Sequence, residues 1–325
     1  MRIVHHLSQA RPVETPSRVR SHVTIGVFDG LHRGHQRIIR GLVESAHRLG
    51  DQAVVITFDP HPSTVLGGSP CLLLTTIGER LELMQSLELD IAVVYPFTED
   101  VARTSAQEFV DNLMRYLDLA EIRVGPDFTL GCGKEGDVDY LTDLGASLGF
   151  EVHVTDPVKW KDNAVRSSRI RDALRHGDVE EASGCLGRPY RLSGVVVRGR
   201  GLGQDIGVPT ANISPPPNRL IPASGVYACQ AHTERWGTYP AAVNVGTRPT
   251  FAAPSNAQGM TVEAHLLDFD RNLYDSVLGL DFVARLRDER AYPTLNALVA
   301  QLREDIRQTR ALLTGPQTTT GRPDR

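Results

Sequence analysis

Short apolar runs alternate with longer amphipathic stretches through the first half of the chain. The apolar runs lie between residues 21 and 158 and read VTIGVFD, AVVITFDP, DIAVVYPF, EIRVGPDF and EVHVTDPV. Strands of a parallel sheet are buried on both faces and read as continuous apolar runs, whereas the stretches between them have helical spacing. The pattern predicts βαβ units, and therefore an α/β domain built on a parallel sheet.

Local signals mark the ends of the predicted helices. Thr76 followed by Glu79, and Ser105 followed by Glu108, have the spacing of capping boxes at helix starts. Another helix is predicted by apolar residues at helical spacing that end at a glycine, Gly50, a residue type that often stops a helix. These apolar residues are Ile39, Leu42, Val43, Ala46 and Leu49.

The pattern changes after residues 183–189, SGCLGRP. From there LSGVVVRG, GVYACQA, AAVNVGT, TVEAHLLDF and LDFVARLR follow one another with turn-rich segments between them. This succession predicts an antiparallel sheet or barrel. A final amphipathic helix is expected after Pro293, with Thr294 as its cap and an apolar stripe of Leu295, Leu298, Leu302, Ile306 and Leu313.

These patterns divide the chain into two unlike modules, because no internal repeat relates its halves. We expect one domain over residues 1–186, a second over 187–314 and a disordered tail over 315–325. A length of 325 residues suits two domains, at roughly 100–200 residues per domain.

Composition narrows the class of partners and the compartment. Hydrophobic residues make up 41% and charged residues 23% of the chain, which is typical of a globular protein. The net charge is −4 and no dense basic tract occurs, so we expect no nucleic-acid partner. No apolar run approaches the ~18 residues of a membrane span. The four cysteines form no CxxC pair, which favours the cytoplasm over a disulfide-forming compartment: Cys71, Cys132, Cys185 and Cys229.

A glycine-rich turn with two histidines follows the first apolar run. It reads GVFDGLHRGH over residues 26–35 and leads directly into a helical stretch. Helix N-termini attract anions, imidazoles donate hydrogen bonds to phosphate oxygens, and glycine lets a ligand approach the backbone. The turn therefore indicates phosphoryl or nucleotidyl transfer. Taken alone, HxGH is more often two surface histidines beside a turn.

Oxygen-bearing side chains mark a second candidate site. In an extended segment, Thr210 and Asn212 project to the same side and offer oxygens to a hard cation. Farther along, Glu263 lies on the polar face of an alternating run. The alternatives are an ordinary polar strand face for the first pair and a solvent-facing carboxylate for Glu263.

Together, the motifs of the first half resemble the adenylyltransferase module of prokaryotic riboflavin kinase/FAD synthetases, which has an HxGH nucleotidyltransferase fold with a Rossmann-like parallel sheet. Besides the turn, the similar motifs are TFDPHP at 57–62, VGPDFTLG at 124–131 and RSSRIR at 166–171. The resemblance implies that His32 and His35 are catalytic and handle the ATP phosphates. It also implies an ATP and phosphate site formed by Gly26, Phe28, Asp29, Gly30, Gly34, Ser168 and Arg171, and a flavin site that includes His61, Asp127 and Phe128.

The second half resembles the riboflavin kinase module of the same family, a mostly antiparallel β-barrel with a C-terminal helix. The similar segments are LGRPYRLSGVVV, GVPTAN, GVYA, NVGTRPTF and VEAHLLDFDRNLYD. The resemblance implies that Thr210 and Asn212 hold Mg²⁺ and that Gly207 and Thr210 bind ATP phosphates. It makes Glu263 the base for the riboflavin 5′-hydroxyl and places Asn244 and Arg248 at the flavin.

Two departures from the family pattern mark where this chain differs. The late motif of the first module usually reads SSTxxR, whereas here Arg166 replaces the first serine while Ser168 and Arg171 are kept. The kinase loop usually reads RGRxLGFPTAN, and here Leu202 and Gln204 stand in place of its arginines.

The resemblance predicts a bifunctional cytoplasmic enzyme with riboflavin, FMN and ATP as substrates and Mg²⁺ as cofactor. It would convert riboflavin and ATP to FMN and ADP, and FMN and ATP to FAD and diphosphate. Two alternatives stay open at this point. One is an FMN adenylyltransferase with an impaired kinase domain, and the other is a flavin-binding regulatory protein without catalytic activity.

Overall fold

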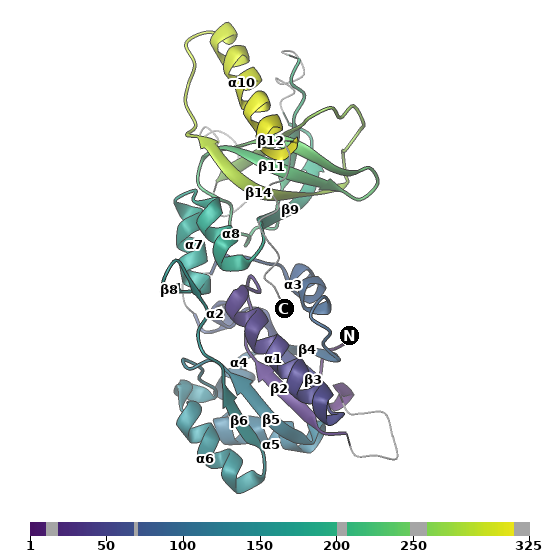
Figure 1. The fold of residues 1–325 in the computed structure, drawn as a ribbon, viewed down its shortest axis with the longest axis vertical. Helices are drawn as coiled ribbons and strands as arrows, with labels where there is room; N and C mark the ends of the chain where they lie inside the picture. The colour runs from purple at the N-terminus through teal and green to yellow at the C-terminus, as the bar shows by residue number, and fades with distance from the viewer. Residues whose placement is uncertain (11–18, 68–70, 200–206, 248–258, 315–325) are drawn as a thin grey trace. The chain divides into compact units, whose positions relative to one another are not determined.

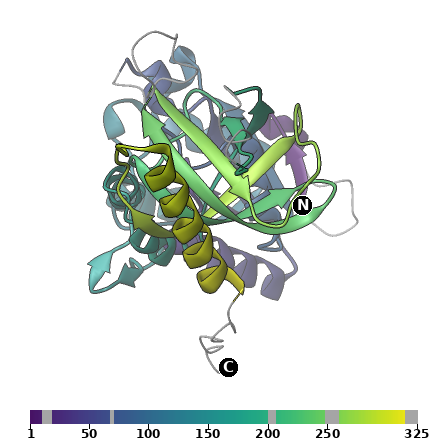
Figure 2. The ribbon, with the colours of Figure 1, turned by 90° about the horizontal axis from the view of Figure 1, so that it is seen from above.

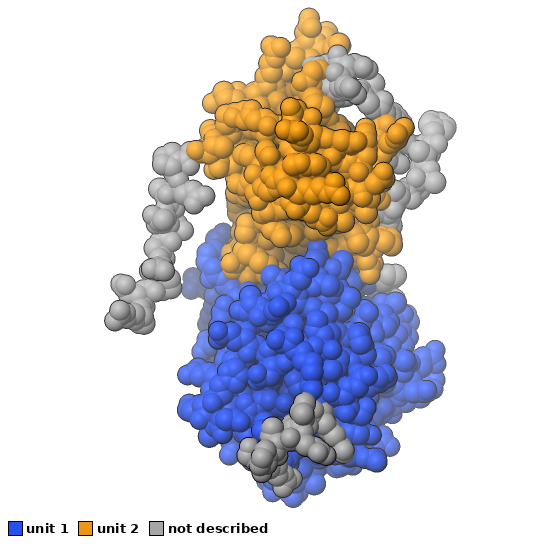
Figure 3. Space-filling model, turned by 90° about the vertical axis from the view of Figure 1, so that its right-hand side faces the viewer, with its two compact units in different colours: residues 1–167 blue, residues 168–325 orange. Residues whose placement is uncertain are grey.

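The protein is described from a computed structural model, which describes residues 1–10, 19–67, 71–199, 207–247 and 259–314. The chain divides into two compact units, Met1–Ser167 and Ser168–Arg325, coloured separately in Figure 3. The unit boundary falls after the first residue of α7 (Ser167–Arg175), which together with α8 (Val179–Leu186) leads into the barrel. The domain boundary after residue 186 stays a prediction.

The first unit is built on a six-stranded parallel sheet with the order β1-β4-β3-β2-β5-β6 (Figure 1). Its strands are β1 (Arg2–Val4), β2 (Ser21–Ile25), β3 (Gln52–Asp59), β4 (Ile91–Pro96), β5 (Leu119–Val124) and β6 (Glu151–Val154). From β2 the chain builds outward through β3 and β4, then returns to place β5 on the other side of β2. The sheet confirms the predicted α/β class, whereas β1 was not among the predicted strands.

Helices connect these strands. They are α1 (Arg33–Leu49), α2 (Pro62–Val65), α3 (Ile77–Gln85), α4 (Glu99–Arg103), α5 (Ala106–Leu117) and α6 (Val138–Leu148), with short 3-10 turns at η1 (Leu7–Ala10) and η2 (Cys132–Lys134). Both predicted capping boxes are present, at the starts of α3 and α5. Gly50 ends α1 in the left-handed region, as predicted. Leu49 is 67% exposed, so the buried stripe of α1 ends before it.

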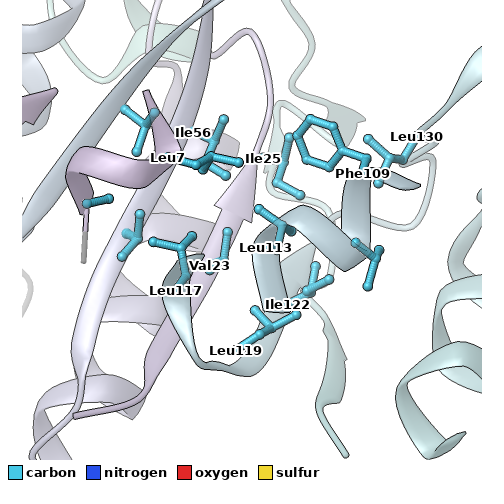
Figure 4. Packing of buried hydrophobic residues seen from close by; sticks show 14 of the residues in the cluster. Leu7, Val23, Ile25, Ile56, Phe109, Leu113, Leu117, Leu119, Ile122 and Leu130 are labelled. Carbon is cyan, nitrogen blue, oxygen red and sulfur yellow. The ribbon is translucent and has the colours of Figure 1, made fainter. Parts of the chain in front are cut away.

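Alternate residues of the central strands feed two hydrophobic clusters, one on each face of the sheet. On one face, Val23, Ile25 and Ile56 pack with side chains of α5 and η1 (Figure 4). On the other face, Ala53 and Val55 pack with side chains of α1 and α3. The sheet is therefore covered on both faces, which explains why its strands lack a polar alternation in the sequence.

The second unit is a closed barrel of six strands in the order β10-β13-β12-β11-β14-β9, with antiparallel pairing throughout. Its strands are β9 (Tyr190–Val197), β10 (Ala211–Ser214), β11 (Gly225–Thr233), β12 (Gly237–Thr247), β13 (Met260–Leu266) and β14 (Val277–Arg287). Along β13, Val262, Ala264 and Leu266 are buried in the barrel and the residues between them are half-buried. The barrel confirms the predicted architecture.

The C-terminal helix α10 (Leu295–Thr314) packs across β11 and β12 (Figure 2). Thr294 caps it by accepting a hydrogen bond from the Ala297 N–H, as predicted. Arg287 on β14 binds Asp305 of α10 through two hydrogen bonds of 2.9 and 2.7 Å. Asp305 is only 1% exposed, so this ion pair fixes the helix against the barrel.

No helix in the described residues combines the length and apolar character that a membrane crossing needs.

Candidate active sites

The pocket of the first unit opens at the carboxyl ends of β2, β5 and β6 and has a volume of about 340 Å³. It lies where the strand order reverses, between β2 and β5. Open parallel sheets bind ligands at such switch points, because the loops of the two halves diverge there. Seven predicted site residues line this pocket: Gly26, Phe28, His32, Gly34, His35, Asp127 and Phe128.

The two histidines form one stacked unit at the start of α1. His32 caps the helix, and its Nδ1 accepts a hydrogen bond of 3.3 Å from the His35 backbone N–H. The two rings stack with their centroids 3.5 Å apart. A Cβ on Gly34 would lie 3.1 Å from the His32 ring, so any larger residue between the histidines would press on this ring. The HxGH spacing thus places both imidazoles at a helix N-terminus.

The charge state of His35 follows from its surroundings. Burial, the nearby His32 ring and the Arg80 guanidinium together hold the pKa of His35 well below its usual value. His35 is therefore uncharged at neutral pH in the free enzyme. A neutral imidazole still carries one N–H, so it can donate a hydrogen bond to a phosphate oxygen.

Asp29 and Gly30, two predicted phosphate-binding residues, do not line the pocket. The Asp29 carboxylate is buried and accepts hydrogen bonds of 3.0 Å from the backbone N–H groups of Leu74 and Thr75. The Gly30 N–H donates to the Thr75 hydroxyl at 3.0 Å. Both residues thereby tie the turn between β2 and α1 to the segment that precedes α3.

The other predicted residues of this site come from three further segments of the chain. Asp127 makes a 2.6 Å ion pair with Arg166, and both side chains are exposed. The arginine that departs from the family motif thus contacts a predicted flavin residue. His61 caps α2 by accepting a hydrogen bond from the Ser63 N–H and does not line the pocket. Ser168 and Arg171 lie on α7, within the second unit.

The strand register of the barrel brings three predicted kinase residues into one row. Glu263 on β13 is the partner of Asn212 on β10 and of Asn244 on β12. Directly paired residues of antiparallel strands project to the same face, so the carboxylate lies between two carboxamides. A Cβ on Gly199 would collide with the Asn212 side chain, which shows how closely this amide packs on the backbone of the preceding segment.

Two pockets meet beside this row. One, of about 280 Å³, is lined by Glu263, Asn244 and apolar side chains of α10. The other, of about 370 Å³, is lined by Pro209 and residues 269–274. Thr210 lines both pockets. The imidazole of His265 donates a 2.8 Å hydrogen bond to the Pro209 carbonyl, which holds the segment before Thr210 against β13.

Some predicted features of the second site are not covered by this geometry. Gly207 is described and adopts a positive φ of 74°, a backbone conformation that favours glycine. Arg248 and the altered loop positions 202 and 204 lie outside the described residues. Within the described residues no cluster of three or more His, Cys, Asp or Glu side chains could hold a metal ion. Thr210 and Asn212 offer hydroxyl and amide oxygens, a different donor set.

Three functional candidates escaped the sequence patterns: Arg80 near the histidine turn, and the pair of Arg287 and Asp305, which lines the pocket of about 280 Å³. A signal for Asp305 exists in the sequence. It lies on the apolar stripe of α10 between Leu302 and Thr309, where an acid side chain requires a buried partner. Arg80 lies four residues before Met84, which is fully buried, and so shares the buried face of α3.

Comparison with known proteins supports two modules. A family model described as FAD synthetase matches residues 15–169, and one described as riboflavin kinase matches residues 186–313. A bifunctional riboflavin kinase/FMN adenylyltransferase of Pseudomonas fluorescens is 35% identical over 290 residues, covering 89% of this chain and 92% of the relative. The enzyme of the same description from Escherichia coli K12 is 33% identical over 307 residues, covering 94% and 95%.

A solved structure has a similar fold. The crystal structure of a protein from Streptococcus pneumoniae, described as a macrolide-efflux protein, superposes with a TM-score of 0.83 at 29% identity. The match covers 95% of this chain and 99% of that one. The succession of a parallel sheet and a barrel is therefore shared over the full length of that protein.

Proposed function

Because the chain belongs to the bifunctional riboflavin kinase/FMN adenylyltransferase family, we propose that its two units divide the two reactions of that family. The prediction of a bifunctional enzyme is confirmed: the chain makes FMN and ADP from riboflavin and ATP, and FAD and diphosphate from FMN and ATP. The sheet unit carries adenylyl transfer and the barrel unit carries riboflavin phosphorylation. The residue roles below are proposals.

The stacked histidine pair at the start of α1 is the observation that supports adenylyl transfer in the sheet unit. An oxygen of the FMN phosphate attacks the α-phosphorus of ATP, the bond to the β-phosphate oxygen breaks, and diphosphate leaves. The attacking phosphate is already anionic, so no base is needed. His32, His35 and the first N–H groups of α1 hold the triphosphate and stabilise its developing charge.

The flavin of FMN is assigned to the other wall of the same pocket. Asp127 and Phe128 follow β5 and line the pocket together with the histidines. Arg166, which also lines the pocket, forms an ion pair with the Asp127 carboxylate. His61, Ser168 and Arg171 keep their proposed roles through the family resemblance alone.

In the barrel unit, Thr210 lies at the junction of an ATP pocket and a flavin pocket. Riboflavin occupies the pocket lined by apolar side chains of α10, with Asn244 beside its ring system and its 5′-hydroxyl near Glu263. Glu263 takes the hydroxyl proton while the oxygen attacks the γ-phosphorus of ATP, and ADP leaves. Gly207 and Thr210 contact the phosphates, and Arg248 binds the flavin.

The donor set at this junction fits Mg²⁺, which prefers oxygen ligands and keeps several waters and substrate phosphates. Thr210 would supply its hydroxyl and Asn212 its amide oxygen. When bound, the ion neutralises charge on the ATP phosphates. We also infer a cytoplasmic location, because the substrates include ATP and none of the four cysteines, which all lie within the described residues, forms a disulfide.

Product analysis by chromatography with purified full-length protein tests whether both activities are present, and variants of Glu263 and of the two histidines test their division between the units. Riboflavin with MgATP must give FMN and FAD, and FMN with MgATP must give FAD. FAD from FMN without any FMN from riboflavin would establish the impaired-kinase alternative. Flavin binding without either product would establish the regulatory alternative.

A further inference from the structure

The turn that carries the histidines has an unfavourable backbone conformation. Phe28 has a φ of 52°, Gly30 of 78° and Leu31 of 39°, three left-handed residues within four positions. Non-glycine residues rarely adopt this region, and they persist there only where the surrounding structure enforces it. Because His32 follows directly, the interactions that hold this turn also set the position of the histidine pair.

A network of buried hydrogen bonds holds the turn, and the side chains that form it do not line the ligand pocket. The Thr57 hydroxyl donates to the Val27 carbonyl at 3.0 Å, and the Gly30 N–H donates to the Thr75 hydroxyl at 3.0 Å. The Thr75 hydroxyl donates in turn to the Asp29 carboxylate at 3.1 Å. Thr57, Asp29 and Thr75 are 0%, 2% and 4% exposed. Three successive points of the turn are thus bound to the sheet and to the segment before α3.

Arg80 of α3 connects the two arms of this network. Its Nη1 donates to the Thr57 hydroxyl at 3.1 Å, and its Nη2 lies 3.9 Å from Asp29 Oδ1. The side chain is 2% exposed, so its charge is removed from water. A buried guanidinium is tolerated only with partners such as these, and removing one member of such a set is costly.

We propose that Arg80 is a positioning residue for adenylyl transfer, which holds the Val27–His32 turn in its phosphate-binding conformation through Thr57 and Asp29. The inference rests on the proposed function of the sheet unit. Arg80 does not line the ligand pocket, so it acts through the turn rather than through contact with ATP. It also places a fixed positive charge beneath a site that receives a triphosphate.

That charge has a second, separable consequence. Two titratable or charged groups act directly on His35: His32 at the same helix N-terminus and Arg80 of α3. Asp29 lies beside Arg80. Asp127 and Arg166 line the same pocket as His35. A nearby cation opposes protonation, so loss of Arg80 lets His35 take up a proton at higher pH. The acid limb of the pH profile for FAD formation therefore moves to higher pH when this charge is removed.

Four variants of the full-length protein test the proposal, with FMN formation by the barrel unit as an internal control. Arg80→Met lowers kcat/KM for ATP in FAD formation by about 10- to 100-fold and moves the acid limb of the pH profile to higher pH. Arg80→Lys keeps the positive charge, so the acid limb stays at the wild-type pH. Thr57→Val breaks the hydrogen bonds but keeps the charge, so it lowers kcat/KM by roughly 3- to 10-fold without moving the limb. FMN formation stays unchanged in all of them.

The matched control is Arg123→Met, which breaks the 2.7 Å ion pair of another largely buried arginine with Glu121 in the same unit. Its kcat/KM for ATP stays within about twofold of wild type. Equal losses in Arg123→Met and Arg80→Met would overturn the proposal, as would a folded Arg80→Met protein with wild-type kinetics. If Arg80→Met is insoluble, unchanged FAD formation by Thr57→Val overturns it. A wild-type protein that makes no FAD would instead contradict the proposed function.

Discussion

The two sites of this enzyme are encoded in different ways. In the sheet unit, one continuous segment from Gly26 to His35 supplies both histidines and the glycine-rich turn of the pocket, because a strand, a turn and a helix N-terminus meet there. In the barrel unit, Asn212, Asn244 and Glu263 come from three strands and meet only through their register. The histidine motif at the edge of the parallel sheet is therefore local in sequence, although the rest of its pocket is not, whereas the row on the barrel face depends on long-range pairing throughout.

The two sites also handle charge differently. The sheet unit surrounds its phosphate site with a helix N-terminus, a neutral His35 and a buried arginine, all fixed before ATP arrives. The barrel unit offers a carboxylate beside oxygen donors, and its family loop lacks two arginines here. We expect preorganised protein groups to dominate the first reaction, and Mg²⁺ with a proton acceptor to dominate the second.

The largest effect that separates the sites is expected from Glu263→Gln. The change keeps the size of the side chain and removes its ability to accept a proton. FMN formation from riboflavin falls by about 10²- to 10⁴-fold, the usual contribution of a general base. FAD formation from supplied FMN stays at the wild-type rate, measured by chromatography on the same preparation. Equal loss of both activities would contradict the separation of the two sites.

The reciprocal change is His35→Ala, with His32→Ala as its companion. Loss of a preorganised donor to the triphosphate lowers kcat for FAD formation by about 10²- to 10³-fold. Riboflavin phosphorylation is unaffected, because neither histidine belongs to the barrel unit. Initial rates of both reactions, at saturating MgATP, provide the measurement. FAD synthesis at the wild-type rate in both variants rules out the histidine site.

The same contrast explains how much the sequence could predict. The turn, both capping boxes and the alternation along β13 depend on neighbouring residues, and the structure has all of them. The pairing of Glu263 with Asn212 and Asn244 could not be predicted, because register depends on the turns and packing of the whole barrel. The sequence indicated the face of each residue but not its partner.

The contacts of buried polar side chains also could not be predicted from the sequence. Asp29 belongs to the histidine motif, yet its carboxylate accepts hydrogen bonds from the backbone of Leu74 and Thr75. Arg80 has no local signal beyond its place on the buried face of α3. A hydrogen bond between segments about fifty residues apart is a tertiary property, so a motif identifies the segment without identifying what each side chain contacts.

A smaller effect is expected from restoring charge to the kinase loop with Leu202→Arg and Gln204→Arg. Charge-assisted hydrogen bonds to the ATP phosphates would lower KM for ATP in FMN formation by about tenfold. Kinetics of FAD formation from FMN would stay the same. Titration of MgATP at saturating riboflavin measures the change. An unaltered KM would show that the residues already present neutralise the triphosphate.

The smallest effect compares the alkaline stability of the two units. Burial raises the pKa of Tyr227 to about 12, opposed by the nearby Arg285 guanidinium and supported by smaller contributions from Cys229 and Asp288. In the unfolded chain a tyrosine ionises near pH 10. The folded state resists ionisation, so this contribution to stability is complete below about pH 10 and is lost as the pH rises toward 12.

Tyr227→Phe tests this loss, with Tyr95→Phe as the control in the sheet unit, where burial raises the pKa of Tyr95 as well. The Tyr227 hydroxyl donates to the Ala223 carbonyl at 2.6 Å, so its removal costs about 1 kcal/mol at neutral pH. Between about pH 10 and pH 11, the free energy of unfolding of the wild-type protein then falls by about 1 kcal/mol through Tyr227 ionisation, a loss that Tyr227→Phe does not have. Urea unfolding at several pH values measures both the loss of the hydrogen bond at neutral pH and the loss through ionisation at high pH. Because the pKa of Tyr227 is raised further than that of Tyr95, Tyr227→Phe must reduce the loss of unfolding free energy at high pH more than Tyr95→Phe does. The reverse order would place the alkaline sensitivity in the sheet unit instead.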